Sequence, residues 1–162
     1  MIHLIVGNTG AGKTTYSNVL KEKNNGVIFS IDHWNKTLFL PDKKEHDGLA
    51  WFLERIDRAE EMIMSLIHQL EESSVDTILD LGLSKFDHRQ KFREFALENS
   101  YQLKLHYLDI SKEERLSRIE ERNQTRGATY SFDVTNEEFE FKEKWFERPT
   151  NEELVDAIVL LK

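Results

Sequence analysis

The sequence contains no cysteine among its 162 residues. This absence excludes disulfide bridges, thiolate zinc sites and cysteine nucleophiles, and it suits a reducing compartment. The sequence also lacks any run of 18 apolar residues, so we expect no membrane span. Met1 leads directly into apolar residues without a basic region before them, which predicts no signal peptide and a cytoplasmic location.

Basic side chains are fewer than acidic ones in this sequence. The 22 Lys and Arg residues face 30 Asp and Glu residues, and the formal net charge is −8. This balance argues against a broad nucleic-acid-binding surface, although it leaves room for a local basic patch. With 39 % hydrophobic and 32 % charged residues, the composition is that of a globular protein. The length predicts one domain over residues 1–162, large enough to bury its own core.

Apolar runs alternate with segments of helical periodicity along the chain. We predict strands over residues 2–6, 27–31, 75–81, 103–108 and 155–161. Helices are predicted over residues 13–23, 49–70, 84–98, 111–123 and 135–146, the last three starting at capping-box patterns. Residues 33–50 and 124–134 are expected to be irregular. The alternation predicts an α/β fold in which a parallel sheet carries helices on both faces.

A phosphate-binding pattern directly follows the first predicted strand. The pattern G-x-x-x-x-G-K-[ST] is matched at every fixed position by Gly7-Asn8-Thr9-Gly10-Ala11-Gly12-Lys13-Thr14. Glycines let the backbone approach phosphate oxygens, while amide N–H groups and the helix N-terminus supply positive potential. Lys13 would reach the β- and γ-phosphates, and Thr14 would offer its hydroxyl to Mg²⁺. The sequence therefore predicts a nucleoside triphosphate site.

Two aspartates follow the second and third predicted strands. Ligands of parallel sheets bind beyond the carboxyl ends of the strands, so Asp32 and Asp80 should converge on the phosphate loop. Asp32 is the candidate that orients an acceptor hydroxyl and takes its proton; the alternative is a turn or helix-capping residue. Asp80 needs a partner in an apolar strand. That partner is either Mg²⁺ or a set of loop amides or the Thr15 hydroxyl.

Three arginines share one face of the helix predicted from residue 111. Arg115, Arg118 and Arg122 occur at i, i+3 and i+7, and Arg126 follows. Arginine can neutralise the charge that develops during phosphoryl transfer. Spacing alone instead favours a solvated face on which these arginines pair with nearby glutamates.

Other polar and aromatic residues carry weaker signals. The six histidines show no metal-ligand spacing, so we predict no zinc site. His33 and Trp34 directly follow Asp32, and Arg89 lies early in the helix after the third strand. Whether these three residues touch a ligand is left open.

The chain resembles small P-loop kinases of the AAA-type ATP-binding group, which are related to polynucleotide kinase, chloramphenicol phosphotransferase and zeta toxins. The resemblance is carried by the stretches 7–15, 30–34, 78–82, 105–109, 118–123 and 146–154. It implies a five-stranded parallel core, ATP with Mg²⁺, and an arginine-bearing lid near residues 111–134 with Arg118 and Arg122 as catalytic groups. It also implies that Asp32 handles the acceptor hydroxyl, beside a substrate-side insert near residues 33–50.

The expected function is therefore transfer of the γ-phosphoryl group of ATP to a hydroxyl of a small molecule. In this hypothesis Lys13, Asp32, Arg118 and Arg122 are catalytic, residues 7–15 bind the nucleotide, and Thr14 and Asp80 hold the metal. A 5′-hydroxyl polynucleotide kinase is a second hypothesis. It is disfavoured because the basic residues of the 33–50 segment are balanced by acidic ones. A non-catalytic ATP-binding regulatory module is a third.

Overall fold

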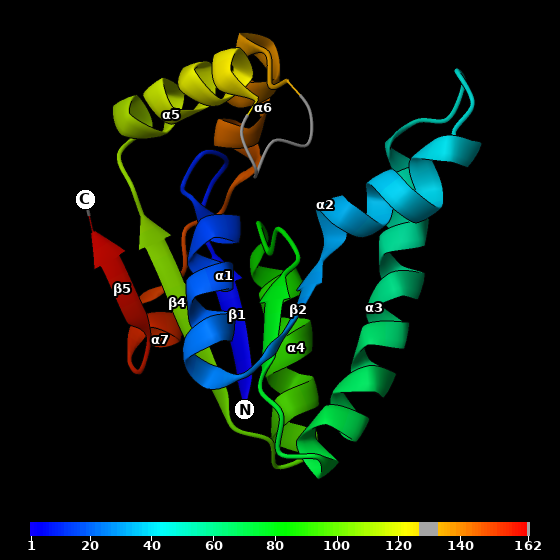
Figure 1. The fold of residues 1–162 in the computed structure, drawn as a ribbon, viewed down its shortest axis with the longest axis vertical. Helices are drawn as coiled ribbons and strands as arrows, with labels where there is room; N and C mark the ends of the chain where they lie inside the picture. The colour runs from blue at the N-terminus through cyan, green and yellow to red at the C-terminus, as the bar shows by residue number, and fades with distance from the viewer. Residues whose placement is uncertain (127–132, 162) are drawn as a thin grey trace.

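A computed structural model describes residues 1–126 and 133–161 of the chain. Its centre is a sheet of five parallel strands in the order β2-β3-β1-β4-β5 (Figure 1). The strands are β1 (Ile2–Val6), β2 (Val27–Ser30), β3 (Thr77–Asp80), β4 (Leu103–Asp109) and β5 (Ile158–Leu161). This architecture confirms the predicted α/β fold and its parallel sheet.

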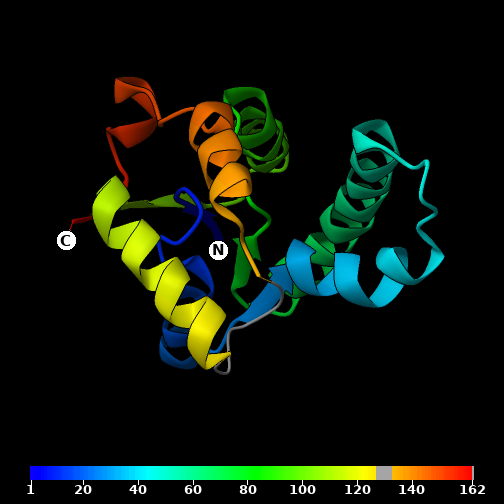
Figure 2. The same ribbon diagram turned by 90° about the horizontal axis from the view of Figure 1, so that it is seen from above.

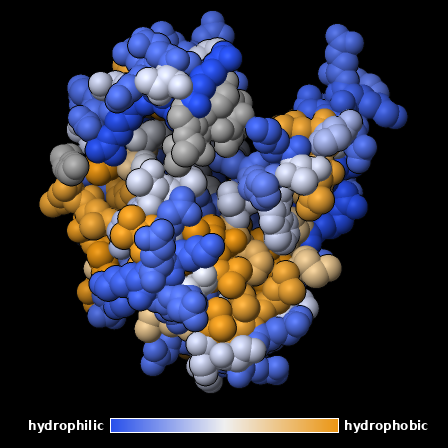
Figure 3. Space-filling model, in the orientation of Figure 1, coloured by the Kyte–Doolittle hydropathy of each residue, from blue (hydrophilic) through white to orange (hydrophobic). Residues whose placement is uncertain are grey.

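Helices cover both faces of the sheet. Helix α1 (Lys13–Asn24) packs on one face, whereas α3 (Leu49–Glu72) and α4 (Phe86–Glu98) enclose the larger core on the other. Helices α5 (Lys112–Thr125) and α6 (Asn136–Trp145) lie above the carboxyl ends of the strands (Figures 1 and 2). In Figure 3, hydrophilic residues cover this upper part, and hydrophobic residues gather lower, around the sheet. The phosphate loop therefore lies under two polar helices.

The helix starts agree with the sequence in two of three cases. Thr135 forms a full capping box with Glu138, and the Ser111 hydroxyl accepts a hydrogen bond from the Glu114 amide. The capping box predicted at Ser84 is wrong, because Lys85 is the N-cap and its side chain makes no capping bond. The Ser84 hydroxyl instead donates to the Gly82 carbonyl. The carboxylate of Glu147 accepts from the Phe86 amide, so a distant residue does the capping.

The segment after β2 differs from its prediction. The strand ends at Ser30, and a helical stretch follows through α2 (Ile31–Trp34), the π-helix η1 (Asn35–Phe39) and the 3₁₀-helix η2 (Leu40–Asp42). The Ser30 hydroxyl accepts from the His33 amide and caps this stretch, and Trp34 and Phe39 pack against the core. Only residues 43–48 remain irregular.

The end of the chain holds a short helix that sequence periodicity cannot detect. Helix α7 (Asn151–Leu154) starts at a capping box between Thr150 and Glu153, and β5 begins at residue 158 rather than 155. Four residues are too few to show a helical repeat. Most of the loop predicted over residues 124–134 lies outside the described residues, and α5 runs on to Thr125. No helix among the described residues is long and apolar enough to cross a membrane.

A buried chain of polar rings joins α1 to the amino-terminal edge of the sheet. The Tyr16 hydroxyl lies 2.8 Å from His106 Nδ1, His106 Nε2 lies 2.9 Å from His3 Nδ1, and His3 Nε2 lies 3.0 Å from Asp76. Burial alone would raise the pKa of Asp76, but hydrogen bonds from His3 and the N-terminal ammonium lower it. Because an ionised Asp76 only accepts, His3 donates to it from Nε2.

This chain of rings makes the protein less stable in acid. Burial, together with nearby His3 and Lys104, lowers the pKa of His106 to about 4 from 6.5. In the unfolded chain the pKa of His106 returns to 6.5, so the unfolded chain takes up a proton before the folded one does. The folded protein therefore has its full stability above pH 6.5 and loses this contribution as the pH falls from 6.5 to 4. We expect a loss of at most about 2 kcal/mol between pH 7 and pH 5.

Urea unfolding at both pH values measures this loss. His106→Gln should show a smaller pH dependence than the unsubstituted chain, and His46→Gln, at an exposed position, should show the same one. Equal pH dependence in all three proteins would contradict the assignment to His106.

Candidate active site

The phosphate loop has the backbone that its glycines allow. Gly10 and Gly12 have φ angles of +80° and +91°, and Gly12 precedes the first residue of α1. A Cβ atom at Gly10 would lie 2.6 Å from the Arg115 carbonyl oxygen, so a larger residue would force the loop away from α5. The turn therefore needs glycine both for its left-handed conformation and for close packing.

Lys13 is folded back into this loop. Its Nζ donates to the carbonyls of Gly7 at 2.9 Å and Asn8 at 3.4 Å. Burial lowers the pKa of Lys13, and the carboxylates of Asp80 and Asp32 oppose this effect. The Lys13 ammonium group donates to two backbone carbonyls and interacts with Asp80 and Asp32 through charge alone. It can therefore turn toward an incoming anion at a small cost in free energy.

Most of the predicted residues line one cleft of about 220 Å³. The loop and the start of α1 form its floor, the two aspartates one wall and α5 another. Its lining consists of Thr9, Gly10, Gly12, Lys13, Thr14, Thr15, Asp32, Asp80, Arg118, Ile119 and Arg122. The predicted convergence of the strand ends is thus present in the structure.

Asp80 ends β3 and is buried beside the start of α1. Thr14 Oγ1 donates to Asp80 Oδ2 at 2.9 Å, so the hydroxyl partner is Thr14 and not Thr15. Burial raises the pKa of Asp80, and Lys13 and Thr14 oppose the shift. A carboxylate in this environment gains from a further cation.

Asp32 reaches the cleft from a helix rather than from a strand end. It lies in the first turn of α2, two residues beyond the Ser30 that pairs with Asp80 in the sheet register. Its side chain is exposed at the cleft. The sequence placed it in the correct neighbourhood because β2 and β3 are adjacent and parallel.

The arginines of α5 divide into two groups. Arg115 is buried and donates to the carbonyls of Ile110 and Thr9 and to Glu143, so it supports the loop from behind. Arg118 lines the cleft and donates to the Ala11 carbonyl and to Glu114. Arg122 also lines the cleft, and its Nε is buried without a hydrogen-bond partner. The solvated face suggested by spacing is therefore wrong for Arg115, which is buried, whereas Arg118 pairs with Glu114 as that alternative expected.

Several predicted loop residues lie behind the cleft instead of lining it. Gly7 offers its carbonyl to Lys13, Ala11 is buried, and Asn8 turns its amide toward Glu143. Glu143 was not predicted, because α6 reaches the loop only through the tertiary fold.

The other candidates lie elsewhere. Arg89 is fully buried in a bidentate pair with Glu153 and cannot contact a ligand from there. Trp34 packs edge-on against Phe29, with ring centroids 5.9 Å apart. His33 is exposed, and Arg126 pairs with Asp133 at 3.2 Å.

A sheet in this order, with a glycine-rich loop between β1 and α1, defines the fold of small P-loop kinases. The chain belongs to the AAA domain family, whose model matches residues 2–149. None of the curated proteins matches it.

Solved structures with low sequence identity share this fold. Chaetomium thermophilum Kti12 in complex with ADP-AlF3 superposes with a TM-score of 0.72 at 13 % identity, covering 99 % of this chain and 89 % of that one. A gluconokinase from Sinorhizobium meliloti 1021 gives 0.62 at 14 % identity, with 98 % and 81 % covered. Mycobacterium tuberculosis APS kinase CysC, in complex with AMPPNP and APS, gives 0.63 at 13 % identity, with 99 % and 87 % covered.

Proposed function

We propose that this protein binds ATP and transfers its γ-phosphoryl group to a hydroxyl of a small molecule. The observation that carries the proposal is the cleft in which Lys13, Asp32 and Arg122 meet beside the phosphate loop. Support comes from the similar folds, since the Kti12 and APS kinase structures hold ADP-AlF3 and AMPPNP, and two of the three proteins described above are named kinases.

Each part of the cleft has a role in this transfer. The loop amides and Lys13 hold the β- and γ-phosphates, with Thr15 at the start of α1 beside them. Asp32 orients the acceptor hydroxyl, whose oxygen forms a bond to the γ-phosphorus while the bond to the β–γ bridging oxygen breaks. The hydroxyl proton passes to Asp32, and ADP leaves. Arg118 and Arg122 neutralise the charge on the transferring group.

One residue at the end of β3 and one at the start of α1 fit a magnesium ion. Thr14 and Asp80 present hard oxygen atoms of the kind Mg²⁺ binds, and because burial raises the pKa of Asp80, its ionised form would gain from a nearby cation. Bound there with the nucleotide, Mg²⁺ would neutralise charge on the β- and γ-phosphates. We also propose that the 33–50 segment forms the acceptor side and that α5, the described helix of the 111–134 segment, covers the nucleotide; residues 127–132 of that segment lie outside the described residues.

Titration calorimetry with ATP and magnesium, followed by radiolabelled phosphoryl transfer to a panel of hydroxylated metabolites, tests the proposal. Lys13→Met should weaken ATP binding at least tenfold, because it removes the one mobile cation of the loop. Lys21→Met, an exposed lysine of the same helix, serves as the matched control and should bind normally. Absence of ATP binding by the unsubstituted chain would overturn the proposal. Binding without transfer to any acceptor would support a regulatory module instead.

A further inference from the structure

A carboxylate of α6 holds the back of the phosphate loop. Glu143 accepts from Asn8 Nδ2 with one oxygen and from Arg115 Nη2 at 2.6 Å with the other. The Glu143 side chain is 19 % exposed and that of Arg115 is 7 % exposed, so water competes little for these bonds. Both oxygens of the carboxylate are therefore used by groups that contact the loop.

The two residues that Glu143 binds, Asn8 and Arg115, each make a hydrogen bond to a backbone group of Thr9. Asn8 Oδ1 accepts from the Thr9 amide at 2.7 Å, and Arg115 Nη1 donates to the Thr9 carbonyl at 3.2 Å. Glu143 can only accept, so it fixes which end of the Asn8 amide faces α6 and which faces the Thr9 N–H. The peptide groups on both sides of Thr9 are thereby held by residues that Glu143 orients.

The loop needs such external support. Gly10 follows Thr9 directly, and glycine samples many backbone conformations at similar free energy. A site that must order its loop on binding loses affinity relative to one that is already ordered.

We propose that Glu143 is a positioning residue that keeps the phosphate loop in its nucleotide-binding conformation through Asn8 and Arg115. The proposal rests on the proposed ATP binding and adds a residue that lies outside the phosphate loop and the α5 arginines. Glu143 does not line the cleft, so it acts only through the residues it holds.

Glu143→Gln tests this role with little change of shape. Glutamine offers one oxygen and one N–H₂ group, so it cannot give Asn8 and Arg115 an acceptor oxygen each. If Asn8 turns its oxygen toward Gln, the Thr9 amide loses its acceptor. Leaving one such group unsatisfied predicts an affinity for ATP about tenfold weaker. Tripolyphosphate, which contacts the phosphate loop without a nucleoside, should weaken by the same factor.

Glu140→Gln is the matched control. Glu140 lies one turn earlier on α6 and pairs at the surface with Lys112, so its variant should bind ATP and tripolyphosphate like the unsubstituted chain. Asn8→Ala should weaken binding as Glu143→Gln does, and the double variant should be no weaker than the single ones. A merely structural role would lower stability without this coupling.

The outcomes separate the two proposals. An unsubstituted chain that binds neither ATP nor tripolyphosphate would remove the proposed function itself. A chain that binds both, with Glu143→Gln unchanged or with effects that simply add to those of Asn8→Ala, would overturn only the role of Glu143. Should Glu143→Gln fail to fold, Glu143→Asp keeps the carboxylate at shorter reach and is expected to bind ATP with intermediate affinity.

Discussion

Replacement of Asp32 by asparagine is expected to lower the rate of phosphoryl transfer roughly 10²- to 10⁴-fold, because the amide cannot accept the proton of the acceptor hydroxyl. The side chain keeps its shape at the start of α2, so the helix and the cleft should persist. ATP affinity should change little, since phosphate binding depends on Lys13 and the loop amides. The rate of label transfer to an accepted substrate, measured beside calorimetric ATP affinity, separates these effects.

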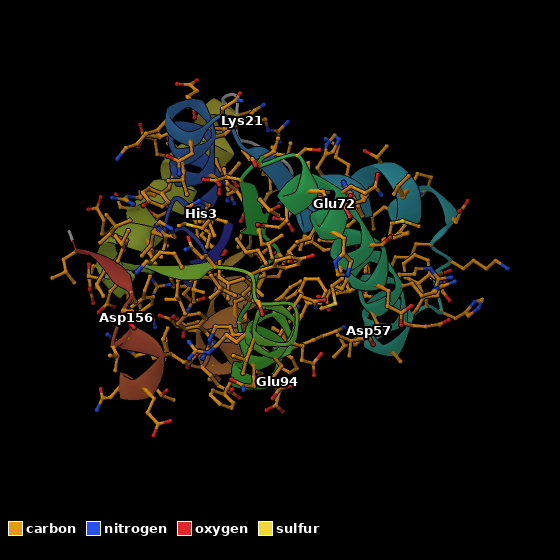
Figure 4. The ribbon with its side chains drawn as sticks, turned by 90° about the horizontal axis from the view of Figure 1, so that it is seen from below. His3, Lys21, Asp57, Glu72, Glu94 and Asp156 are labelled. Carbon is orange, nitrogen blue, oxygen red and sulfur yellow. The ribbon has the colours of Figure 1, made fainter. Side chains whose placement is uncertain are left out.

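The matched control for this variant is Asp156→Asn. Asp156 lies before β5, at the edge of the sheet opposite the cleft; Figure 4 shows it and His3 from that side. This control should transfer phosphate at the original rate. An Asp32→Asn protein with undiminished turnover would exclude Asp32 as the base.

Arg89→Leu is expected to destabilise the fold by about 3–5 kcal/mol, because it leaves the Glu153 carboxylate buried without its partner. Arg89 is fully buried and makes two bonds to Glu153, at 2.6 and 3.0 Å. Its remaining nitrogen donates to the carbonyls of Leu83 and Glu147. Burial alone would raise the pKa of Glu153, but hydrogen bonds from Arg89 and Thr150 lower it.

Urea unfolding at neutral pH measures this loss. Arg58→Leu is the control, because Arg58 is 60 % exposed and pairs with Glu54 at the surface. It should change the free energy of unfolding by about 0.5 kcal/mol or less. The double replacement of Arg89 and Glu153 by leucine should recover much of the loss, since no charge stays buried alone. Equal stability of Arg89→Leu and Arg58→Leu would show that the buried pair contributes nothing.

The predictions that the structure confirms came from short, contiguous stretches of the sequence. The run of residues 7–14 specifies the phosphate loop because its glycines, lysine and threonine act on neighbouring atoms. The β1 and β4 segments are recognisable as buried strands because most of their residues are apolar. Asn25 ends α1 in the left-handed conformation, with its amide bound to the Lys21 carbonyl, as its local sequence predicts.

The features that local sequence patterns did not predict depend on residues whose partners are remote in the chain. Arg89 pairs with a glutamate 64 residues later, and Glu147 caps α4 from 61 residues away. Arg115 meets Glu143 across 28 residues, with the helix face alone indicating solvent. No local pattern distinguishes such a charged residue from an exposed one.

By itself, the amino-acid order determined the alternation of strands and helices and the loop that precedes α1, because backbone preferences and burial periodicity act over a few residues. Only the packing of α4, α5, α6 and α7 decided which charged groups support the phosphate loop from behind and which are buried in the interior. Burial makes an unpaired charge costly, so those partners are selected by three-dimensional proximity and leave no trace in local spacing.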